Sequence, residues 1–376
     1  MSKKSAKLVL LTVLAVISLL LIAERSLIPG LFSNLSPDNS FDLLAIVIHN
    51  IRNNYIEEVN PEQTMTGALK GMVNSLDALS CYLDQESMQR HSQRMETDLK
   101  DIGVVLYKRY GTFPLVIGII ENSPAQKRGI QIGDSISAID NKAPQMMSLL
   151  EATLYLKDRD EKPVKLRTIR GNKTQEISVE RTQLYEEPVS FTPAEGTSGI
   201  LKIHHLNPPS VKTAKEKILS RLQSVKNPLI LDLRNCYEGD IQEARKLINI
   251  FLKASKIGYF ANKEDPKEYL GCPDNAELEK LPLVVWTNQA TYGPAEIVAG
   301  VLQEFKRAKI IGLQTPGLAA KHKFFRLEDG SGLLLTSGIF HLNSGKKLWE
   351  KGVEPDVKIK IEEQSDSIYL KKSFSS

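Results

Sequence analysis

Cysteine is scarce in this chain. Its 376 residues include three cysteines, Cys81, Cys236 and Cys272, and no two of them have CxxC spacing. Because an odd number of widely separated cysteines does not make a disulfide framework, we expect no small disulfide-stabilised fold. A single Cys236–Cys272 bridge stays an open alternative, since two thiols can pair wherever the compartment is oxidising and their geometry allows it.

Strong charge of one sign is also missing. The net charge is +4, and Lys and Arg are interleaved with acidic residues along the chain. This pattern argues against a nucleic-acid partner, which needs a concentrated basic surface. His204 and His205 are adjacent, and neighbouring side chains on a strand point to opposite faces, so together with His341 they do not indicate a metal site. We expect no metal and no cofactor.

One apolar segment, residues 8–23, carries no charge, and Lys3, Lys4 and Lys7 precede it. As a helix it would be about 24 Å long, slightly shorter than the roughly 30 Å hydrocarbon core of a bilayer. No small-x-small cleavage site follows, so we expect an uncleaved anchor rather than a cleaved signal peptide. The basic flank then predicts a single-pass protein of the cytoplasmic membrane, with most of the chain exported to the periplasmic or other extracytoplasmic side.

The chain is long enough for two or three domains. Helical spacing of apolar residues comes first, then short β-rich runs around one helix, then alternating strands and helices. We therefore expect a multidomain α/β and α+β protein whose core holds a mixed sheet. The expected parts are an anchor and linker at 1–40, a helical region at 41–100, a β-rich domain at 101–181, an α/β core at 182–362 and a tail at 363–376.

Individual elements follow from the same patterns. In the β-rich domain we expect strands at 104–107, 115–120, 164–169 and 175–180, and a helix at 149–156. In the α/β core we expect strands at 199–203, 229–233, 283–286 and 309–312, and helices at 211–225, 241–252 and 295–305.

The β-rich domain resembles a bacterial PDZ domain. The resemblance is carried by Ile102-Gly103-Val104-Val105, by the segment Asn122-Ser123-Pro124-Ala125 that leads to Gly129, and by Gly133-Asp134. Ser123 is a suitable cap for a short helix with Pro124 in its first position, and Gly129 is suited to end it. PDZ domains bind a peptide C-terminus by strand addition, with backbone N–H groups holding the carboxylate.

The resemblance therefore implies a site for peptide C-termini between a strand and a helix. The strand residues would be Ile102, Gly103, Val104 and Val105, and the helix would contribute Met147, Leu150 and Leu154. Such apolar side chains favour an apolar terminal residue. The alternative is a PDZ fold that only packs against its neighbour domain.

The parts on either side of this domain resemble the carboxy-terminal processing peptidases, also called tail-specific proteases. The motifs include Gly67-Ala68-Leu69-Lys70-Gly71-Met72, Leu231-Asp232-Leu233-Arg234-Asn235, Ala295-Glu296-Ile297-Val298-Ala299-Gly300 and Gly352-Val353-Glu354-Pro355-Asp356. They follow the family's order over roughly residues 42–360. The resemblance implies that the chain has the protease fold and that it can self-associate, because members of this family often assemble.

The family hydrolyses peptides with a serine nucleophile and a lysine base. In this chain Gly293 stands at the serine position and Leu318 at the lysine position, and the spacing between them matches the family without a gap. His322 stands where a glutamine positions the lysine. Glu238 lies in the turn that should hold the oxyanion, where a negative charge is unfavourable. The resemblance thus implies a protease fold without its catalytic pair.

Two substitute nucleophiles stay open. Thr291 lies two residues from the serine position, with Lys321 as a candidate base. Cys236 could use His322 as its base, although a lone cysteine is more often simply packed.

We expect a membrane-anchored, exported and non-catalytic protein that binds peptide tails or serves as a scaffold. One alternative is an active serine-type endopeptidase with a non-standard nucleophile. Another is a structural subunit of a membrane complex, whose PDZ groove is filled by its own chain or by a fellow subunit.

Overall fold

The computed structural model describes residues 37–93, 99–160, 162–184, 187–221, 227–263 and 267–374. The chain divides into two compact units, Met1–Met65 and Thr66–Ser376. Helix α2 (Pro37–Asn54) lies in the first unit, and helix α3 (Pro61–Asn74) begins there and continues into the second.

The expected anchor at 8–23 lies outside the described residues. Among the residues described, no helix is both long and apolar enough to cross a bilayer. The longest of them, α2, has 18 residues but is interrupted by Asp42, His49, Arg52 and several asparagines, and charged or amide groups are costly in hydrocarbon. The prediction of a single-pass location in the cytoplasmic membrane is corrected by this finding.

A small antiparallel sheet forms the first part of the second unit. Its five strands lie in the order β2 (Val104–Tyr107), β3 (Leu115–Ile119), β4 (Ser135–Ile139), β5 (Val164–Arg170) and β6 (Lys173–Val179). Helix α5 (Pro124–Lys127) begins at Ser123, whose hydroxyl accepts the N–H of Gln126 as expected of a cap. Helix α6 (Leu149–Leu156) packs against the interior face of this sheet, which we call the small sheet domain.

The sheet of the α/β core is mixed, as expected. Its order is β16 (Val357–Lys358), β13 (Lys309–Gly312), β12 (Leu283–Thr287), β9 (Leu229–Asp232), β8 (Gly199–Ile203) and β7 (Val189–Thr192). All neighbours are parallel except β7 and β8. The two faces of β9 and β12 are both apolar, which is typical of strands buried on both sides.

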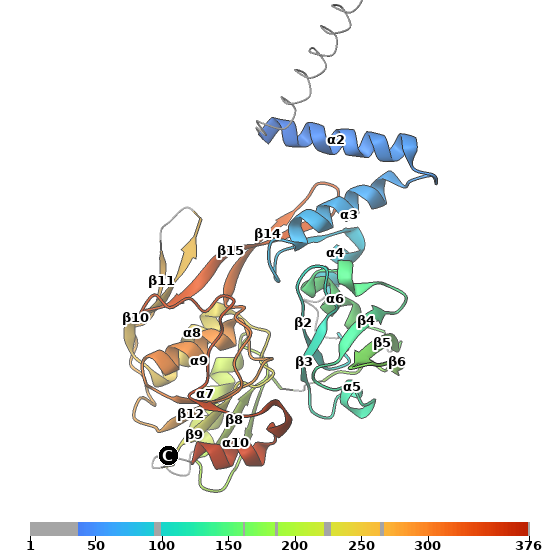
Figure 1. Cartoon of the computed structure of the whole chain (residues 1–376). Helices are drawn as coiled ribbons and strands as arrows, with labels where there is room; N and C mark the ends of the chain where they lie inside the picture. The colour runs from blue at the N-terminus through green and yellow to red at the C-terminus, as the bar shows by residue number, and fades with distance from the viewer. Residues whose placement is uncertain are drawn as a thin grey trace, which may run out of the picture. The chain divides into compact units, whose positions relative to one another are not determined.

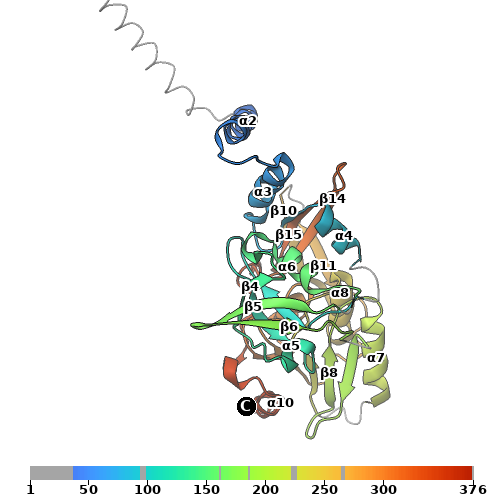
Figure 2. The same cartoon turned by 90° about the vertical axis from the view of Figure 1, so that its right-hand side faces the viewer.

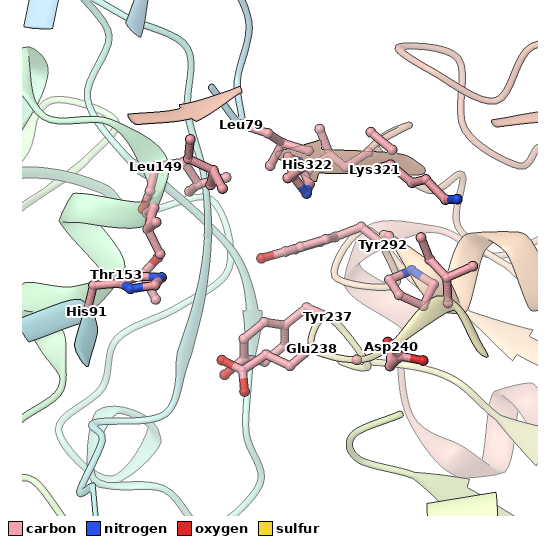
Figure 3. A pocket seen from close by; sticks show the side chains of 18 residues that line it. Leu79, His91, Leu149, Thr153, Tyr237, Glu238, Asp240, Tyr292, Lys321 and His322 are labelled. Carbon is pink, nitrogen blue, oxygen red and sulfur yellow. The ribbon is translucent and has the colours of Figure 1, made fainter. Parts of the chain in front are cut away.

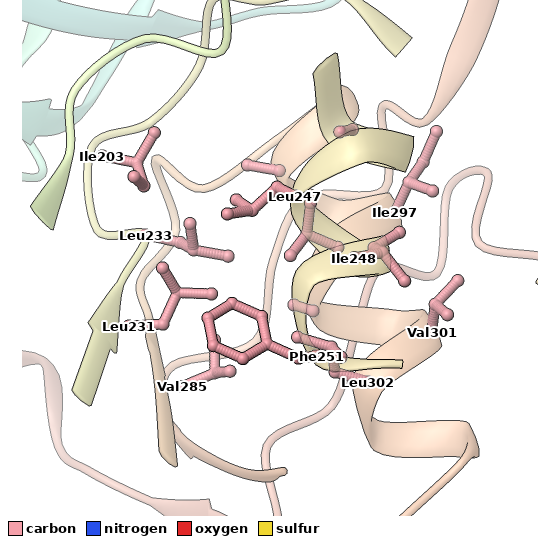
Figure 4. Packing of buried hydrophobic residues seen from close by; sticks show 14 of the residues in the cluster. Ile203, Leu231, Leu233, Leu247, Ile248, Phe251, Val285, Ile297, Val301 and Leu302 are labelled. Atoms are coloured by element: carbon pink, nitrogen blue, oxygen red, sulfur yellow. The ribbon is translucent and has the colours of Figure 1, made fainter. Parts of the chain in front are cut away.

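Helices cover both faces of this sheet. Helices α7 (Ser210–Arg221), α8 (Ile241–Phe251) and α9 (Pro294–Glu304) pack on one face, and α7 lies beside β8 in Figure 2. On this face Phe251 fills the space between Leu231, Val285 and the two helices α8 and α9 (Figure 4). On the other face lies α10 (Asp366–Ser373), labelled in Figure 1. Its Tyr369 packs against Trp286, with 5.1 Å between the ring centroids.

A third sheet was not expected from the sequence. It runs in the order β1 (Cys81–Leu83), β15 (Gly332–Leu342), β10 (Ala254–Asn262) and β11 (Glu268–Cys272), and β14 (Ala320–Arg326) pairs with β15. Helix α4 (Gln85–Gln93) follows β1. The sheet joins the start of the second unit to its end, because Cys81 pairs with Leu334 across about 250 residues of sequence.

Candidate functional site

The site lies at the carboxyl ends of the parallel strands β9, β12 and β13. The chain leaves these strands in three turns, at 233–239, 288–293 and 313–319. Because the carboxyl ends of neighbouring parallel strands meet at one edge, three segments far apart in the sequence come together there.

The carboxylate of Glu296, in the first turn of α9, ties two of these turns together. It is fully buried and accepts four hydrogen bonds. The donors are the N–H groups of Gly293 (3.0 Å), Gly317 (2.6 Å) and Leu318 (2.6 Å) and the hydroxyl of Thr315 (2.5 Å). Burial raises the pKa of this carboxyl to about 7, although the four hydrogen bonds oppose the shift. The two positions expected to hold nucleophile and base are thereby fixed beside each other.

Gly293 forms the sharp turn between β12 and α9. Its φ is 65° and its ψ is −125°, a conformation that residues with a side chain rarely adopt. Turns of this strained kind present the nucleophile in many hydrolases. A Cβ atom at this position would meet nothing nearer than the Leu318 carbonyl oxygen at 4.0 Å. The turn is therefore present, with open space and no reactive group.

Leu318 is 3% exposed and belongs to an apolar cluster shared by two domains. From the α/β core the cluster includes Ala320 and Trp349, and from the small sheet domain it includes Leu149 and Ala152 of α6. A side chain in such surroundings is held by packing, and an ammonium group there would lose its hydration.

A cavity of about 570 Å³ lies between α6 and the three turns. Figure 3 shows Leu149 and Thr153 on one side, Tyr237 and Glu238 opposite them, and the ring of Tyr292 projecting between. The other residues that line it are Leu79, His91, Leu150, Gly239, Asp240, Ile241, Gly293, Pro294, Leu318, Ala320, Lys321, His322 and Leu334. The cavity thus brings together the four altered positions 293, 318, 238 and 322 and one helix of the small sheet domain.

Glu238 is held in an ion pair. One carboxylate oxygen lies 2.8 Å from the ammonium group of Lys157, which follows α6. The same ammonium group lies 3.3 Å from Asp101, and His205 lies 3.8 Å from the other oxygen of Glu238. A carboxylate therefore occupies the turn in which a peptidase would stabilise an oxyanion.

The two substitute nucleophiles are not assembled with a base. The hydroxyl of Thr291 is fully buried, donates to the Leu233 carbonyl at 2.8 Å and accepts the N–H of Asn288 at 3.0 Å. The amine of Lys321 pairs instead with Glu268, and its side chain points away from the middle of the cavity (Figure 3).

Cys236 is equally unsuited to act as a nucleophile. It is 1% exposed within the main apolar cluster, and burial raises the pKa of its thiol far above the usual range, which disfavours the reactive thiolate. Neither Thr291 nor Cys236 lines the cavity, whereas His322 does. Cys81, Cys236 and Cys272 are all free thiols, so the Cys236–Cys272 bridge is not formed.

The residues expected to bind a peptide tail do not share one open groove. Ile102, Val104 and Met147 lie in the interior of the small sheet domain, and Val105 packs in a separate cluster with Tyr237. Gly103 is buried and Leu154 is 2% exposed. Of this set only Leu150 lines the cavity. Strand β2 is nevertheless an edge strand, paired on one side only within the small sheet.

Sequence reasoning missed several residues of the site, among them Tyr237 and Tyr292, which line the cavity, and Lys157, which pairs with Glu238. Tyr237 and Glu238 are neighbours in the altered oxyanion turn, and Tyr292 precedes Gly293. A residue-by-residue reading of these turns could have noted two large rings in a reaction centre. No sequence signal relates Lys157 to Glu238, because they meet only across a domain interface.

Three family models match the chain in order along the sequence. They are "Activating protease CtpB N-terminal domain" over residues 34–87, "PDZ domain" over 100–180 and "Peptidase family S41" over 197–359. The fold and the site thus define a serine-type peptidase fold that contains a PDZ domain. More particularly, the chain contains a Peptidase family S41 domain and a PDZ domain and is similar to carboxy-terminal processing proteases.

Curated relatives are named as proteases. The carboxy-terminal processing protease CtpA of Bacillus subtilis (strain 168) is 28% identical over 354 residues, which cover 93% of this chain and 76% of that protein. A probable CtpA-like serine protease of Staphylococcus haemolyticus (strain JCSC1435) is 25% identical over 312 residues, which cover 82% of this chain but only 62% of that protein. This chain therefore spans less than two thirds of the staphylococcal relative.

A solved structure shares the fold. The photosystem II D1 C-terminal processing protease superposes with a TM-score of 0.69 at 21% identity, covering 84% of this chain and 86% of that one. At this identity the likeness concerns the fold alone.

Replacing Gly293 with alanine should lower the free energy of unfolding by about 1–2 kcal/mol, because the positive φ strains any residue with a Cβ. Gly67→Ala is the matched control, since Gly67 lies in α3, has no positive φ and also has open space around it. It should be neutral or stabilise by up to about 1 kcal/mol. Urea unfolding of both variants measures the difference, and equal effects would contradict the strained turn.

The raised pKa of Glu296 predicts a pH-dependent stability. Between about pH 4.5 and 7 the folded protein holds a proton that the unfolded chain has lost, so the free energy of unfolding falls as pH rises through this window. The loss amounts to up to about 3 kcal/mol. Glu296→Gln does not titrate, so the difference in stability between wild type and this variant should shrink over the same window. A difference that grows with pH would mean that the pKa is lowered instead.

Proposed function

We propose that this protein is a non-catalytic member of the carboxy-terminal processing protease family that binds peptide segments. The carrying observation is the cavity of about 570 Å³, which is lined both by α6 of the PDZ domain and by Gly293, Leu318 and Glu238. It combines a peptide-recognition helix with a reaction centre that has neither nucleophile nor base.

The missing groups act as a unit in a serine–lysine peptidase. Glycine has no atom that can attack a carbonyl, and the leucine side chain cannot accept a proton. Loss of one member of such a unit already removes most of the rate acceleration. Glu238 adds a third obstacle, because its charge opposes the negative charge that develops on the carbonyl oxygen.

The cavity retains features suited to binding. Its volume lies within the range of ligand pockets, and most of its wall is apolar, with Leu79, Leu149, Leu150 and Leu334 on the side of α6. Strand β2 is the edge strand of the small sheet, and strand addition takes place at an edge strand. A peptide with an apolar terminal side chain fits this combination.

The second candidate is an active endopeptidase, favoured by the names of the relatives. It requires a nucleophile among the groups that reach the cavity. The lining contains no serine or cysteine, and the hydroxyl of Thr153 donates to the Leu149 carbonyl at 2.9 Å within its own helix. The geometry therefore favours the non-catalytic proposal.

The full chain should not cleave unfolded casein and should not be labelled by serine-reactive phosphonates. Gly293→Ser alone should stay inactive because Leu318 is no base, and the Gly293→Ser/Leu318→Lys pair should need Glu238→Gly as a third change before any rate appears. Hydrolysis by the wild type that disappears in Thr291→Ala or Cys236→Ala would instead demonstrate a substitute nucleophile.

Peptides that end in a free carboxylate and an apolar residue should bind in the micromolar range, about −8 kcal/mol. Amidation of the terminus should weaken binding strongly, because the backbone donors lose a charged acceptor. Leu150→Glu, in the cavity wall, should weaken binding, whereas Leu219→Glu, an exposed leucine of α7, serves as the matched control. Calorimetry with a diverse tail library measures these affinities, and the absence of any binder would remove the tail-recognition proposal.

A further inference from the structure

A second cavity adjoins the first. It has a volume of about 450 Å³ and is lined by Asp101, Lys157, His205 and, among others, the same Tyr237 and Glu238 that line the first cavity. These two side chains therefore stand between the cavities, at the boundary of the PDZ domain and the α/β core.

The boundary is held by the ion pair of Glu238 with Lys157. Lys157 follows the last residue of α6, whereas Glu238 lies in the turn after β9, so the 2.8 Å contact links the two domains. The side chains of Lys157 and Glu238 are 11% and 25% exposed. An ion pair that is largely shielded from water is weakened less by the solvent than a surface pair.

Asp101 strengthens this arrangement. Its carboxylate lies 3.3 Å from the same ammonium group, and its side chain is 10% exposed. The N–H of Gly103 donates to Asp101 at 3.0 Å, which anchors the carboxylate at the start of β2. The ammonium group of Lys157 is thus fixed from the side of the PDZ domain before it meets Glu238.

The rest of the interface between the PDZ domain and the α/β core is closely packed and contains a hydrogen bond. A Cβ atom on Gly118 of β3 would lie only 2.5 Å from Ala290 and 2.6 Å from the Asn235 side chain, so backbone and core are in direct contact there. The amide of Asn235 donates to the Ile119 carbonyl at 3.0 Å. Val105 and Tyr237 belong to one apolar cluster across the same boundary. The interface between the PDZ domain and the core is thus held at one end by the ion pair beside α6. At its other end it is held by the contacts of β3.

We propose that Glu238 is a latch that holds the PDZ domain docked on the α/β core and closes the passage between the two cavities. The contact depends on the Glu238 side chain itself, so the latch is a property of this chain's own turn. Opening the latch releases α6 and joins the two cavities into one path. The consequence for peptide access rests on the proposed peptide-binding function, whereas the docking itself does not.

The test is a double-mutant cycle on the full chain with Glu238→Gln, Lys157→Gln and the double variant. Hydrogen exchange of the α6 and β3 amides is the readout, because these elements touch the core. Each single variant should raise their exchange rates by about tenfold, and the effect of the double variant should be clearly less than additive, since the Lys157–Glu238 contact is lost in all three. Arg167→Gln is the control, because Arg167 pairs with Glu176 on the exposed surface of the PDZ domain alone.

The possible results of this experiment distinguish the docking role of the latch from the proposed peptide-binding function. Unchanged exchange in both single variants, strictly additive effects, or an equal change in Arg167→Gln would overturn the latch. Loosening of α6 and β3 in the single variants, with a clearly less than additive effect in the double variant, supports it even if no tail peptide binds. If tail peptides do bind, the Glu238→Gln variant should also associate with them faster than the wild type, and an unchanged or slower association would refute the role of the latch in access.

Discussion

The buried carboxylate of Glu296 is the constraint on which the whole site depends. Three of its four donors are backbone N–H groups, those of Gly293, Gly317 and Leu318. A backbone donor is present whatever side chain its residue carries. The side chains at 293 and 318 can therefore differ from a nucleophile and a base without displacing either turn. This separation of geometry from chemistry explains how a peptidase fold surrounds a centre made of glycine and leucine.

The same centre is filled by groups that favour packing over reaction. Tyr292 and Tyr237 lie 5.8 Å apart between ring centroids, and Leu318 joins an apolar cluster with the PDZ domain. The carboxylate of Glu238 forms an ion pair with the ammonium group of Lys157. Each of these side chains lies in, or places its charge in, the region where a peptidase would hold its substrate. Each also adds a contact between the PDZ domain and the core. The residues at the expected catalytic positions thus also contribute to the docking of the PDZ domain on the core.

Much of the fold could be predicted from local patterns. Three elements have the expected bounds: Leu149–Leu156, Gly199–Ile203 and Lys309–Gly312. Their own apolar residues are continuous or alternate, and clear turn signals flank them. The sheet formed by β1, β15, β10, β11 and β14 could not be predicted. Strand β14 is exposed along most of its length, and β15 alternates only weakly, so neither has a strong period. Strand β1, which pairs with β15, lies far away in the sequence, where no local signal relates the two strands.

For the site, the sequence by itself determined which groups are present: glycine and leucine at the two expected catalytic positions, and a glutamate in the expected oxyanion turn. These are identities, and spacing is enough to find them. Only the tertiary structure decided where side chains point. It directed the Thr291 hydroxyl to a backbone carbonyl, buried Cys236, turned Lys321 toward Glu268 and brought Lys157 to Glu238. Direction and burial arise from the packing of segments that are distant in the chain, and a local pattern does not contain that information.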